Sequence, residues 1–277
     1  MNMLSRSLIH KSRAPFVIFL ALFLIVCAGH KPTYPPFTEK SYDQVVENWL
    51  QRFSSKQGAD SLVLLGTSTQ DRPIWAHRFG QGSRTALVMG GIHGDEHSSV
   101  WLMSMCLDTL AFMDFDSVKI YVIPVANPDG LVKNTRQNAN KVDLNRNFPT
   151  ANWKPSAGER SYAPGPFAGS EIETQILVRF LSEHQPAFII TAHAPLACVN
   201  YDGPAENYAA VMAEISGYPA KSDIGYPTPG SMGTFTGDER QIPTITLELQ
   251  KIESPERMHD HVRAVLAALK LLQNQIS

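Results

Sequence analysis

The chain has 277 residues, 43% hydrophobic and 18% charged, which is enough for one domain with a sizeable core and too few for two large ones. Its formal net charge is −2, its sequence pI is near 6.5, and Lys and Arg form no run beyond the N-terminus. This composition argues against a phosphate-binding surface that ignores sequence, so nucleic acid is not an expected partner.

The N-terminal segment has the pattern of a secretory signal. Its basic start is made by Arg6, His10, Lys11 and Arg13. An uncharged apolar run follows and ends in Ala28 and Gly29, as in a signal peptide. Val26 and Ala28 suit cleavage after Ala28, whereas Cys27 could carry a lipid and the run approaches the length of a membrane anchor. We therefore expect residues 1–29 to be a signal peptide or anchor, and the domain to be exported to a bacterial periplasm.

A spacer at residues 30–40, which contains three prolines, precedes a single domain over 41–277. Alternating apolar and helix-like segments predict an α/β fold for this domain. The predicted elements are a helix at 41–53, strands at 61–68, 73–79 and 84–91, a helix at 99–113, a strand at 118–127, a helix at 171–184, strands at 187–193 and 244–249, and a helix at 255–273. Together they predict a mixed, mostly parallel sheet sandwiched between helices.

Three local features refine this prediction. Asp71 to Pro73 are expected to turn between the first two strands, and Ser170 with Glu173 is expected to form a capping box for the helix that follows. Cys106 and Cys198 would be the cysteines left after removal of a signal. An exported protein could join them, but two small buried residues is the favoured interpretation.

The stretch VMGGIHGDEHS at residues 88–98 contains two overlapping motifs. In the first, H-x-x-E, His93 and Glu96 are both metal ligands. In the second, H-x-x-E-H, His93 and His97 are the ligands and Glu96 is the base, which is the inverzincin arrangement. The second interpretation needs a regular helix and a distant third ligand, Glu171 or Glu173. Three nearby glycines disfavour that helix and favour a loop.

Polar residues follow three predicted strands at the point where each strand ends. His93 follows the strand at 84–91, His193 ends the strand at 187–193, and NPDG directly follows the apolar run VKIYVIPVA at 118–126. Ligands of open α/β sheets bind at the carboxyl ends of strands. A catalytic zinc takes three protein ligands, and His93, Glu96 and His193 would supply them. Each residue alone is more simply a hydrogen-bonded surface residue, so the argument depends on their joint position.

Four further residues suit the chemistry of an amide hydrolase. Asn145 and Arg146 stand side by side in DLNRNF, and a guanidinium binds a carboxylate through two hydrogen bonds. Arg136 could polarise a carbonyl and stabilise an oxyanion. Glu248, in the apolar run TITLEL, could take a proton from water and return it to a leaving amine. The plainer alternatives are a polar surface loop and a strand residue on a solvated face.

The order of these motifs, from Gly90 to Glu248, resembles that of the zinc metallocarboxypeptidases of the carboxypeptidase A type. The resemblance implies an α/β sandwich with a mixed eight-stranded sheet and one Zn²⁺ per chain. The roles it implies are zinc ligation by His93, Glu96 and His193, oxyanion stabilisation by Arg136, a carboxylate clamp of Asn145 and Arg146, and general base and acid catalysis by Glu248.

Within this family, HAPLACVNYDGPA and GYPTPGSMGTFTG look like the bacterial murein peptide amidase branch. Those enzymes cleave the bond between γ-D-glutamate and meso-diaminopimelate, so the expected partner is a cell-wall muropeptide. Tyr226 is only a candidate for the tyrosine that larger carboxypeptidases place over the substrate. The alternatives are a general metallocarboxypeptidase acting on peptides, a deacylase of the aspartoacylase type, and a non-catalytic cell-wall binding module of the same fold.

Overall fold

A computed structural model describes residues 37–54, 61–156 and 159–275, so the predicted signal and residues 30–36 of the spacer lie outside the described residues. The helices longer than five residues are α1 (Glu39–Ser54), α2 (His97–Leu110), α3 (Pro128–Lys133), α4 (Ile172–His184), α5 (Glu206–Ser216) and α6 (Pro255–Asn274). Short helical turns are η1 (Leu144–Arg146), η2 (Arg160–Tyr162) and η3 (Thr234–Asp238). The strands are β1 (Ser61–Thr67), β2 (Pro73–Phe79), β3 (Arg84–Met89), β4 (Val118–Ile123), β5 (Phe188–His193), β6 (Cys198–Asp202), β7 (Ala220–Lys221) and β8 (Thr244–Glu248).

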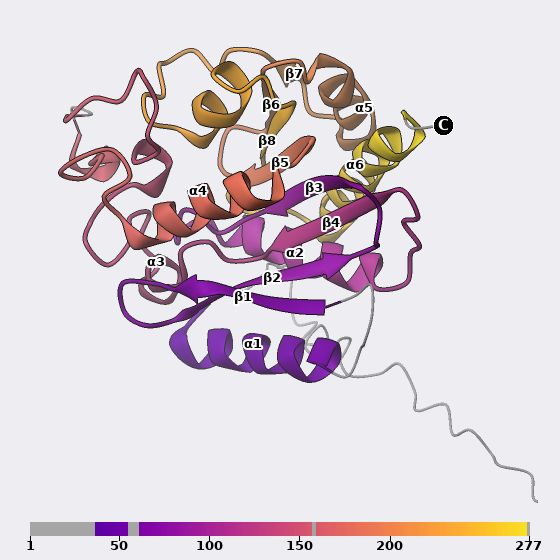
Figure 1. The fold of residues 1–277 in the computed structure, drawn as a ribbon, viewed down its shortest axis with the longest axis horizontal. Coiled ribbons are helices and arrows are strands. Elements are labelled where there is room, and N and C mark those ends of the chain that lie inside the picture. The colour runs from indigo at the N-terminus through magenta and orange to yellow at the C-terminus, as the bar shows by residue number, and fades with distance from the viewer. Residues whose placement is uncertain (1–36, 55–60, 157–158, 276–277) are drawn as a thin grey trace, which may run out of the picture. The chain divides into compact units, whose positions relative to one another are not determined.

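The strands form one mixed sheet in the order β1-β2-β4-β3-β5-β8-β6-β7. Four neighbouring pairs are parallel and three are antiparallel, so the predicted mixed, mostly parallel sheet is confirmed. Figure 1 shows α4 crossing one face of this sheet, with α2 on the other. The central parallel strands β4, β3, β5 and β8 all end at the same edge. Loops that leave those ends therefore meet in one place.

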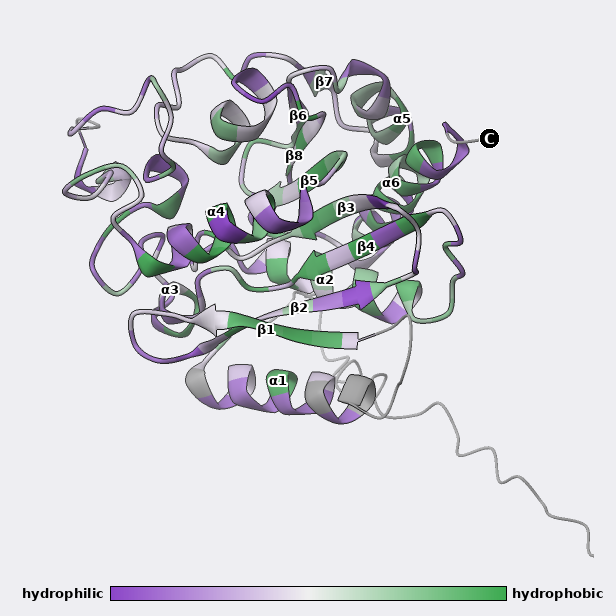
Figure 2. Ribbon diagram, in the orientation of Figure 1, coloured by the Kyte–Doolittle hydropathy of each residue, from purple (hydrophilic) through white to green (hydrophobic). Residues whose placement is uncertain are grey.

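Two apolar layers, one on each face of the sheet, hold the fold together. Alternation along β3 sends Ala86 and Val88 into the layer with α2, α5 and α6, and sends Leu87 and Met89 into the layer with α4. These four side chains are fully buried, and burying a residue such as Leu87 stabilises the fold by about 1.5–3 kcal/mol. In Figure 2 β3 is largely green, whereas α4 alternates between green and purple along its length. The central strands are thus covered on both faces, as their continuous apolar runs predict.

Several local predictions are confirmed and one is wrong. The helix expected at 41–53 and the turn before Pro73 are present. The capping box is not formed: α4 has Glu171 at its N-cap without a side-chain cap bond. Glu173 instead accepts hydrogen bonds from the backbone of Thr69 at 2.9 Å and from the side chain of Asn138 at 3.0 Å. The hydrogen bonds from Thr69 and Asn138 therefore replace the local capping bond that was expected with Ser170.

The NPDG segment is a structural brace next to the site. Asn127 caps α3, accepting a hydrogen bond from Gly130 N at 2.9 Å, and donates to Ile92 O at 3.2 Å. A Cβ on Gly94 would collide with the backbone of Gly130. The missing side chain of Gly94 therefore lets the loop after β3 pack directly on the backbone of α3. No helix in the described part of the chain is both long and apolar enough to cross a bilayer.

Candidate metal centre and active site

Two adjacent strands and one loop bring the predicted metal ligands together. The loop after β3 carries His93 and Glu96, and Glu96 is the N-cap of α2. His193 is the last residue of β5, where it pairs in register with Glu248, the last residue of β8. His93, Glu96 and His193 are 2%, 7% and 4% exposed, so they meet in an interior that water barely enters.

The spacing of the three ligand atoms suits a single small cation. Nδ1 of His93 lies 2.8 Å from Glu96 Oε1 and 3.2 Å from Nδ1 of His193, which is itself 3.2 Å from Glu96 Oε2. Zinc bonds to nitrogen and oxygen are about 2.0–2.1 Å, so ligand atoms at tetrahedral corners stand about 3.3 Å apart. The triad therefore needs only small adjustments to hold one ion.

Asp143 fixes which nitrogen of His93 is free, and the sequence interpretation missed it. Its Oδ1 lies 2.9 Å from His93 Nε2. A carboxylate only accepts hydrogen bonds, so Nε2 carries a hydrogen towards Asp143, and Nδ1 is the nitrogen that a metal would bind after displacing the proton there. Burial alone would raise the pKa of Asp143, but the nearby His93 and Arg136 hold it well below its usual range. The residue was visible as the first letter of DLNRNF, but its use depends on a partner 50 residues away.

The electrostatics of the triad favour a positive charge at its centre. Burial alone would lower the pKa of His93, but the carboxylates of Glu96 and Asp143 outweigh it and raise that pKa to about 9. Burial alone would raise the pKa of Glu96, but His93 and His193 outweigh it and hold that pKa well below its usual range. Two buried carboxylates beside two imidazoles thus favour the binding of a cation such as Zn²⁺.

His97 is outside this cluster. Its Nδ1 accepts a hydrogen bond from Phe37 N at 3.0 Å, and its Nε2 lies 2.7 Å from Asn134 Oδ1. Both ring nitrogens are therefore engaged elsewhere. Glu171 and Glu173, the distant ligands of the inverzincin alternative, both accept from Asn138. The structure gives that alternative neither its second histidine nor its third ligand.

Arg136 and Arg146 flank the triad. Arg136 donates from Nε to Asp143 Oδ2 at 2.9 Å and from Nη1 to Glu96 Oε1 at 3.3 Å. Arg146 is only 5% exposed, and none of the ion pairs between described residues includes it. Its Nη1 donates to the carbonyl of Asn145 at 2.7 Å. A buried guanidinium without a carboxylate partner is suited to binding the anion of a ligand.

Asn145 and Glu248 complete the set, and Tyr226 lies in the same region. Asn145 Oδ1 accepts from Met232 N at 2.8 Å, which ties the segment before β8 to the arginine motif. Glu248 is 8% exposed. Burial raises its pKa, His193 opposes that shift and Glu96 adds to it. Tyr226 is 46% exposed, and the charges of Glu248 and Arg146 both act on its pKa, which burial raises.

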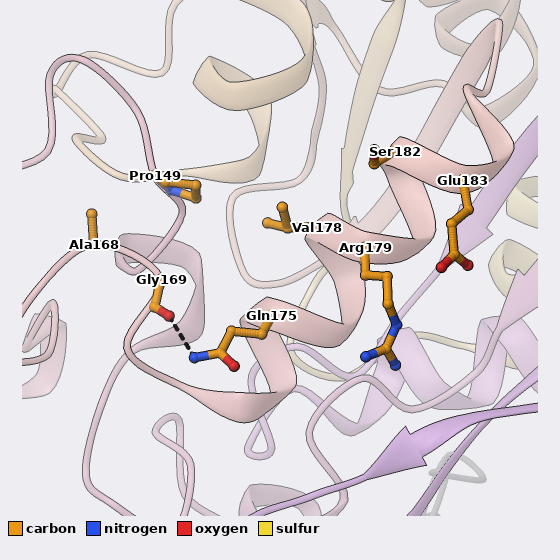
Figure 3. A pocket seen from close by; sticks show the side chains of 8 residues that line it. All are labelled: Pro149, Ala168, Gly169, Gln175, Val178, Arg179, Ser182 and Glu183. Carbon is orange, nitrogen blue, oxygen red and sulfur yellow. Dashed lines mark hydrogen bonds between the residues drawn. The ribbon is translucent and has the colours of Figure 1, made fainter.

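Two other features lie apart from this chemistry. Cys106 and Cys198 are buried and unpaired, which confirms the interpretation as small core residues. A hollow of about 470 Å³ lies beside α4 and is lined by Gln175, Arg179 and Glu183 among others. Figure 3 shows these side chains. None of the residues predicted for the site lines this hollow.

Comparison with known proteins agrees with this geometry. The model of the family described as "Zinc carboxypeptidase" matches residues 46–209. Murein peptide amidase A of Escherichia coli K12 is 36% identical over 209 residues, covering 71% of this chain and 84% of that protein. The corresponding protein of Vibrio campbellii is 35% identical over 202 residues, covering 69% and 79%.

Solved structures show the same relationship. The murein-tripeptide amidase of Escherichia coli O157 superposes with a TM-score of 0.62 at 34% identity, covering 76% of this chain and 91% of that one. Carboxypeptidase A of Helicoverpa armigera gives a TM-score of 0.73 at 16% identity, covering 86% and 74%, and supports the fold alone. On the family match, the sequence relatives and the shared fold, the chain belongs to the zinc carboxypeptidase family and is a hydrolase.

Proposed function

We propose that this protein is a zinc-dependent murein peptide amidase that hydrolyses the amide between γ-D-glutamate and meso-diaminopimelate. The observation that carries the proposal is the convergence of a His₂Glu triad, a buried guanidinium with no ion pair among the described residues, and a buried glutamate at one edge of the sheet. The 36% identity to a murein peptide amidase, over most of both chains, supports the choice of substrate.

The proposed zinc ligands are His93, Glu96 and His193. A zinc ion there would supply Lewis acidity, polarising the scissile carbonyl and making water a better acid. Asp143 holds His93 in the tautomer that offers Nδ1, and it also holds Arg136 beside the triad. The protein thus fixes these groups before the substrate arrives, which lowers the cost of organising the reaction.

The substrate would be held through its free carboxylate. Arg146 would donate two parallel hydrogen bonds to the carboxylate next to the scissile amide, and Asn145 would assist from the adjacent position. Arg136 would donate to the carbonyl oxygen as negative charge develops on it. Since Arg136 is 22% exposed and already next to Glu96, it needs little movement to reach a bound carbonyl.

Glu248 would move the proton. It would accept one from the attacking water and return it to the nitrogen of diaminopimelate as the amide bond breaks. Its position as the register partner of His193 places it beside the triad, and burial raises its pKa towards that of a useful base. The products are then the glutamate-containing peptide, with a new carboxylate, and free diaminopimelate.

Digestion of purified muropeptides with mass-spectrometric identification of the products tests this proposal. The zinc-loaded protein should release diaminopimelate from L-alanyl-γ-D-glutamyl-meso-diaminopimelate, and its Glu248→Gln variant should not. A panel of ordinary peptides with free C-termini, incubated in parallel, tests the general metallocarboxypeptidase alternative. Cleavage of that panel with the tripeptide left intact would overturn the murein assignment and retain the peptidase.

We also propose that the domain is exported. The support comes from the basic residues before the apolar run and from Val26 and Ala28 at the positions expected before a cleavage site. Sequencing the N-terminus of the protein from a periplasmic fraction should begin near Gly29. An intact Met1 in the cytoplasmic fraction, with none in the periplasm, would contradict export.

A further inference from the structure

Tyr162 contacts both arginines of the site. It is the last residue of η2, in the irregular segment between η1 and α4. The Cζ atom of Arg136 lies 4.9 Å from the centre of the tyrosine ring, and that of Arg146 lies 5.5 Å from it. Both distances fall within the range of about 6 Å over which an aromatic ring attracts a cation. One ring therefore interacts with two guanidinium groups that come from different turns of the chain.

The two guanidinium groups need such a partner. They repel each other: burial lowers the pKa of Arg146, Asp143 opposes that shift, and the charge of Arg136 adds to it. Asp143 compensates Arg136 directly through its Oδ2, but Arg146 has only the carbonyl of its neighbour Asn145 as a hydrogen-bond acceptor among the described residues. An aromatic ring attracts both cations without neutralising either, so both remain able to bind an anion.

The backbone around Tyr162 is fixed to the residues next to these arginines. Gln137, which follows Arg136, donates from Nε2 to Arg160 O at 2.5 Å. The backbone N–H of Asp143 donates to Ala163 O at 2.8 Å. The ring is thus anchored on both sides by the same segment whose side chains it contacts. Its position relative to Arg136 and Arg146 is set by these two hydrogen bonds, one from the Gln137 side chain and one between backbone groups.

We propose that Tyr162 is a positioning residue that holds Arg136 and Arg146 ready for the substrate, one for the scissile carbonyl and the other for the free carboxylate. The inference rests on the roles given to these arginines in the proposed function. Without the ring, two long side chains of like charge would spread into several rotamers, and each would have to be ordered again on binding. Tyr162 acts through the arginines and takes no part in the chemistry.

The test compares Tyr162→Leu, which removes the ring, with Tyr162→Phe, which keeps it. Phe167→Leu is the matched control, because it removes an aromatic ring from the same segment at a position that is 61% exposed. For each zinc-loaded variant we would measure kcat and KM on the tripeptide with free and with amidated diaminopimelate carboxylate, and the affinity for free diaminopimelate by calorimetry. Zinc stoichiometry and the melting temperature are recorded alongside.

Tyr162→Leu should lower kcat/KM by about 5–30-fold, as expected for the loss of one or two cation–π contacts. It should weaken diaminopimelate binding by a similar factor while zinc stays stoichiometric. Tyr162→Phe and Phe167→Leu should remain within about threefold of the parent. The loss should be smaller on the amidated substrate, because the contribution of Arg146 is already absent there. If Tyr162→Leu melts early, Tyr162→Met repeats the comparison with a more adaptable side chain.

Parent-like kinetics and binding in Tyr162→Leu would overturn the inference, as would an equal loss in Tyr162→Phe. These outcomes are distinct from failure of the proposed function, in which the parent itself would not cleave the tripeptide. If the parent cleaves ordinary peptides instead, the same variants compared on those peptides decide the role of Tyr162.

Discussion

Replacing Asp143 with Asn tests how the site holds its ligands, because the two side chains have nearly the same shape. The carboxylate accepts three hydrogen bonds. Its Oδ1 accepts from His93 Nε2 and from Asn145 N, both at 2.9 Å, and its Oδ2 accepts from Arg136 Nε at 2.9 Å. An asparagine whose amide oxygen takes the place of Oδ1 keeps the two bonds from His93 and Asn145, but its NH₂ group then faces the N–H of Arg136. The opposite orientation keeps the bond from Arg136 and loses those from His93 and Asn145.

In either orientation Asp143→Asn removes the negative charge that faces His93. Outer partners of ligating histidines are worth about 10–100-fold in metal affinity. At about 1.4 kcal/mol per tenfold change, this is roughly 1.4–2.8 kcal/mol of zinc binding. The preferred orientation also releases Arg136, so kcat/KM at saturating zinc should fall further, by at most the roughly 10²–10³-fold of a lost oxyanion donor.

Competition with a chromophoric chelator measures the zinc affinity, and steady-state kinetics with excess zinc measures the second effect. Asp129→Asn is the matched control. Asp129 is equally buried and accepts hydrogen bonds from Ser68, Gln70 N and Arg72, but it braces the β1–β2 turn instead of the triad. This variant should melt earlier and bind zinc as the parent does. If Asp143→Asn bound zinc as tightly as Asp129→Asn, the reasoning about the His93 tautomer would be refuted.

Four other predictions follow from the structure. Glu248→Gln should keep zinc and substrate affinity while kcat falls by about 10²–10⁴-fold; near-normal turnover would show that another group moves the proton. His193→Ala should lose stoichiometric zinc by elemental analysis, whereas His97→Ala should keep it, and the reverse pattern would restore the inverzincin alternative. Arg146→Lys should lower kcat/KM on the free-carboxylate substrate, and amidating that carboxylate should remove the difference from the parent. Burial lowers the pKa of His77 from 6.5 to about 3. The free energy of unfolding should therefore fall as the pH drops from 6.5 towards 3, by up to about 1.4 kcal/mol per pH unit. Denaturant titrations should give a shallower pH dependence for His77→Gln, and an equal dependence in both proteins would contradict this.

The ligand positions could be predicted because they depend on where apolar strands stop. His93 and His193 follow two central strands that run in parallel, so the rule that such ends share an edge is enough to bring them together. The loop around His93 could be predicted for a similarly local reason. Glycines on both sides of Ile92 and His93 make a regular helix there unfavourable, and α2 begins only at His97.

The features that escaped prediction depend on partners distant in sequence. Asp143 acquires its role from His93, and Glu173 is drawn away from a local cap by Thr69, 104 residues earlier. The strand β7 has only two residues, too few for a periodic pattern. Tyr162 carries no motif at all. Its importance appears only when the ring is seen beside two arginines.

The register pairing of His193 with Glu248 has a consequence for how such an enzyme can diversify. The distance between the metal ligand and the proposed base is set by backbone hydrogen bonds of β5 and β8, so a shift of one residue would turn Glu248 to the opposite face and abolish the reaction. By contrast, the segment that carries Tyr226 is irregular, and its hydrogen bonds to the arginine motif and the residues after it are made at Gly230 and Met232. Insertions and deletions there could change which residue the enzyme removes while the hydrolytic pair stays in place. Libraries that seek new substrate specificity should therefore vary the length of residues 222–227 and leave Gly230 and both strands untouched.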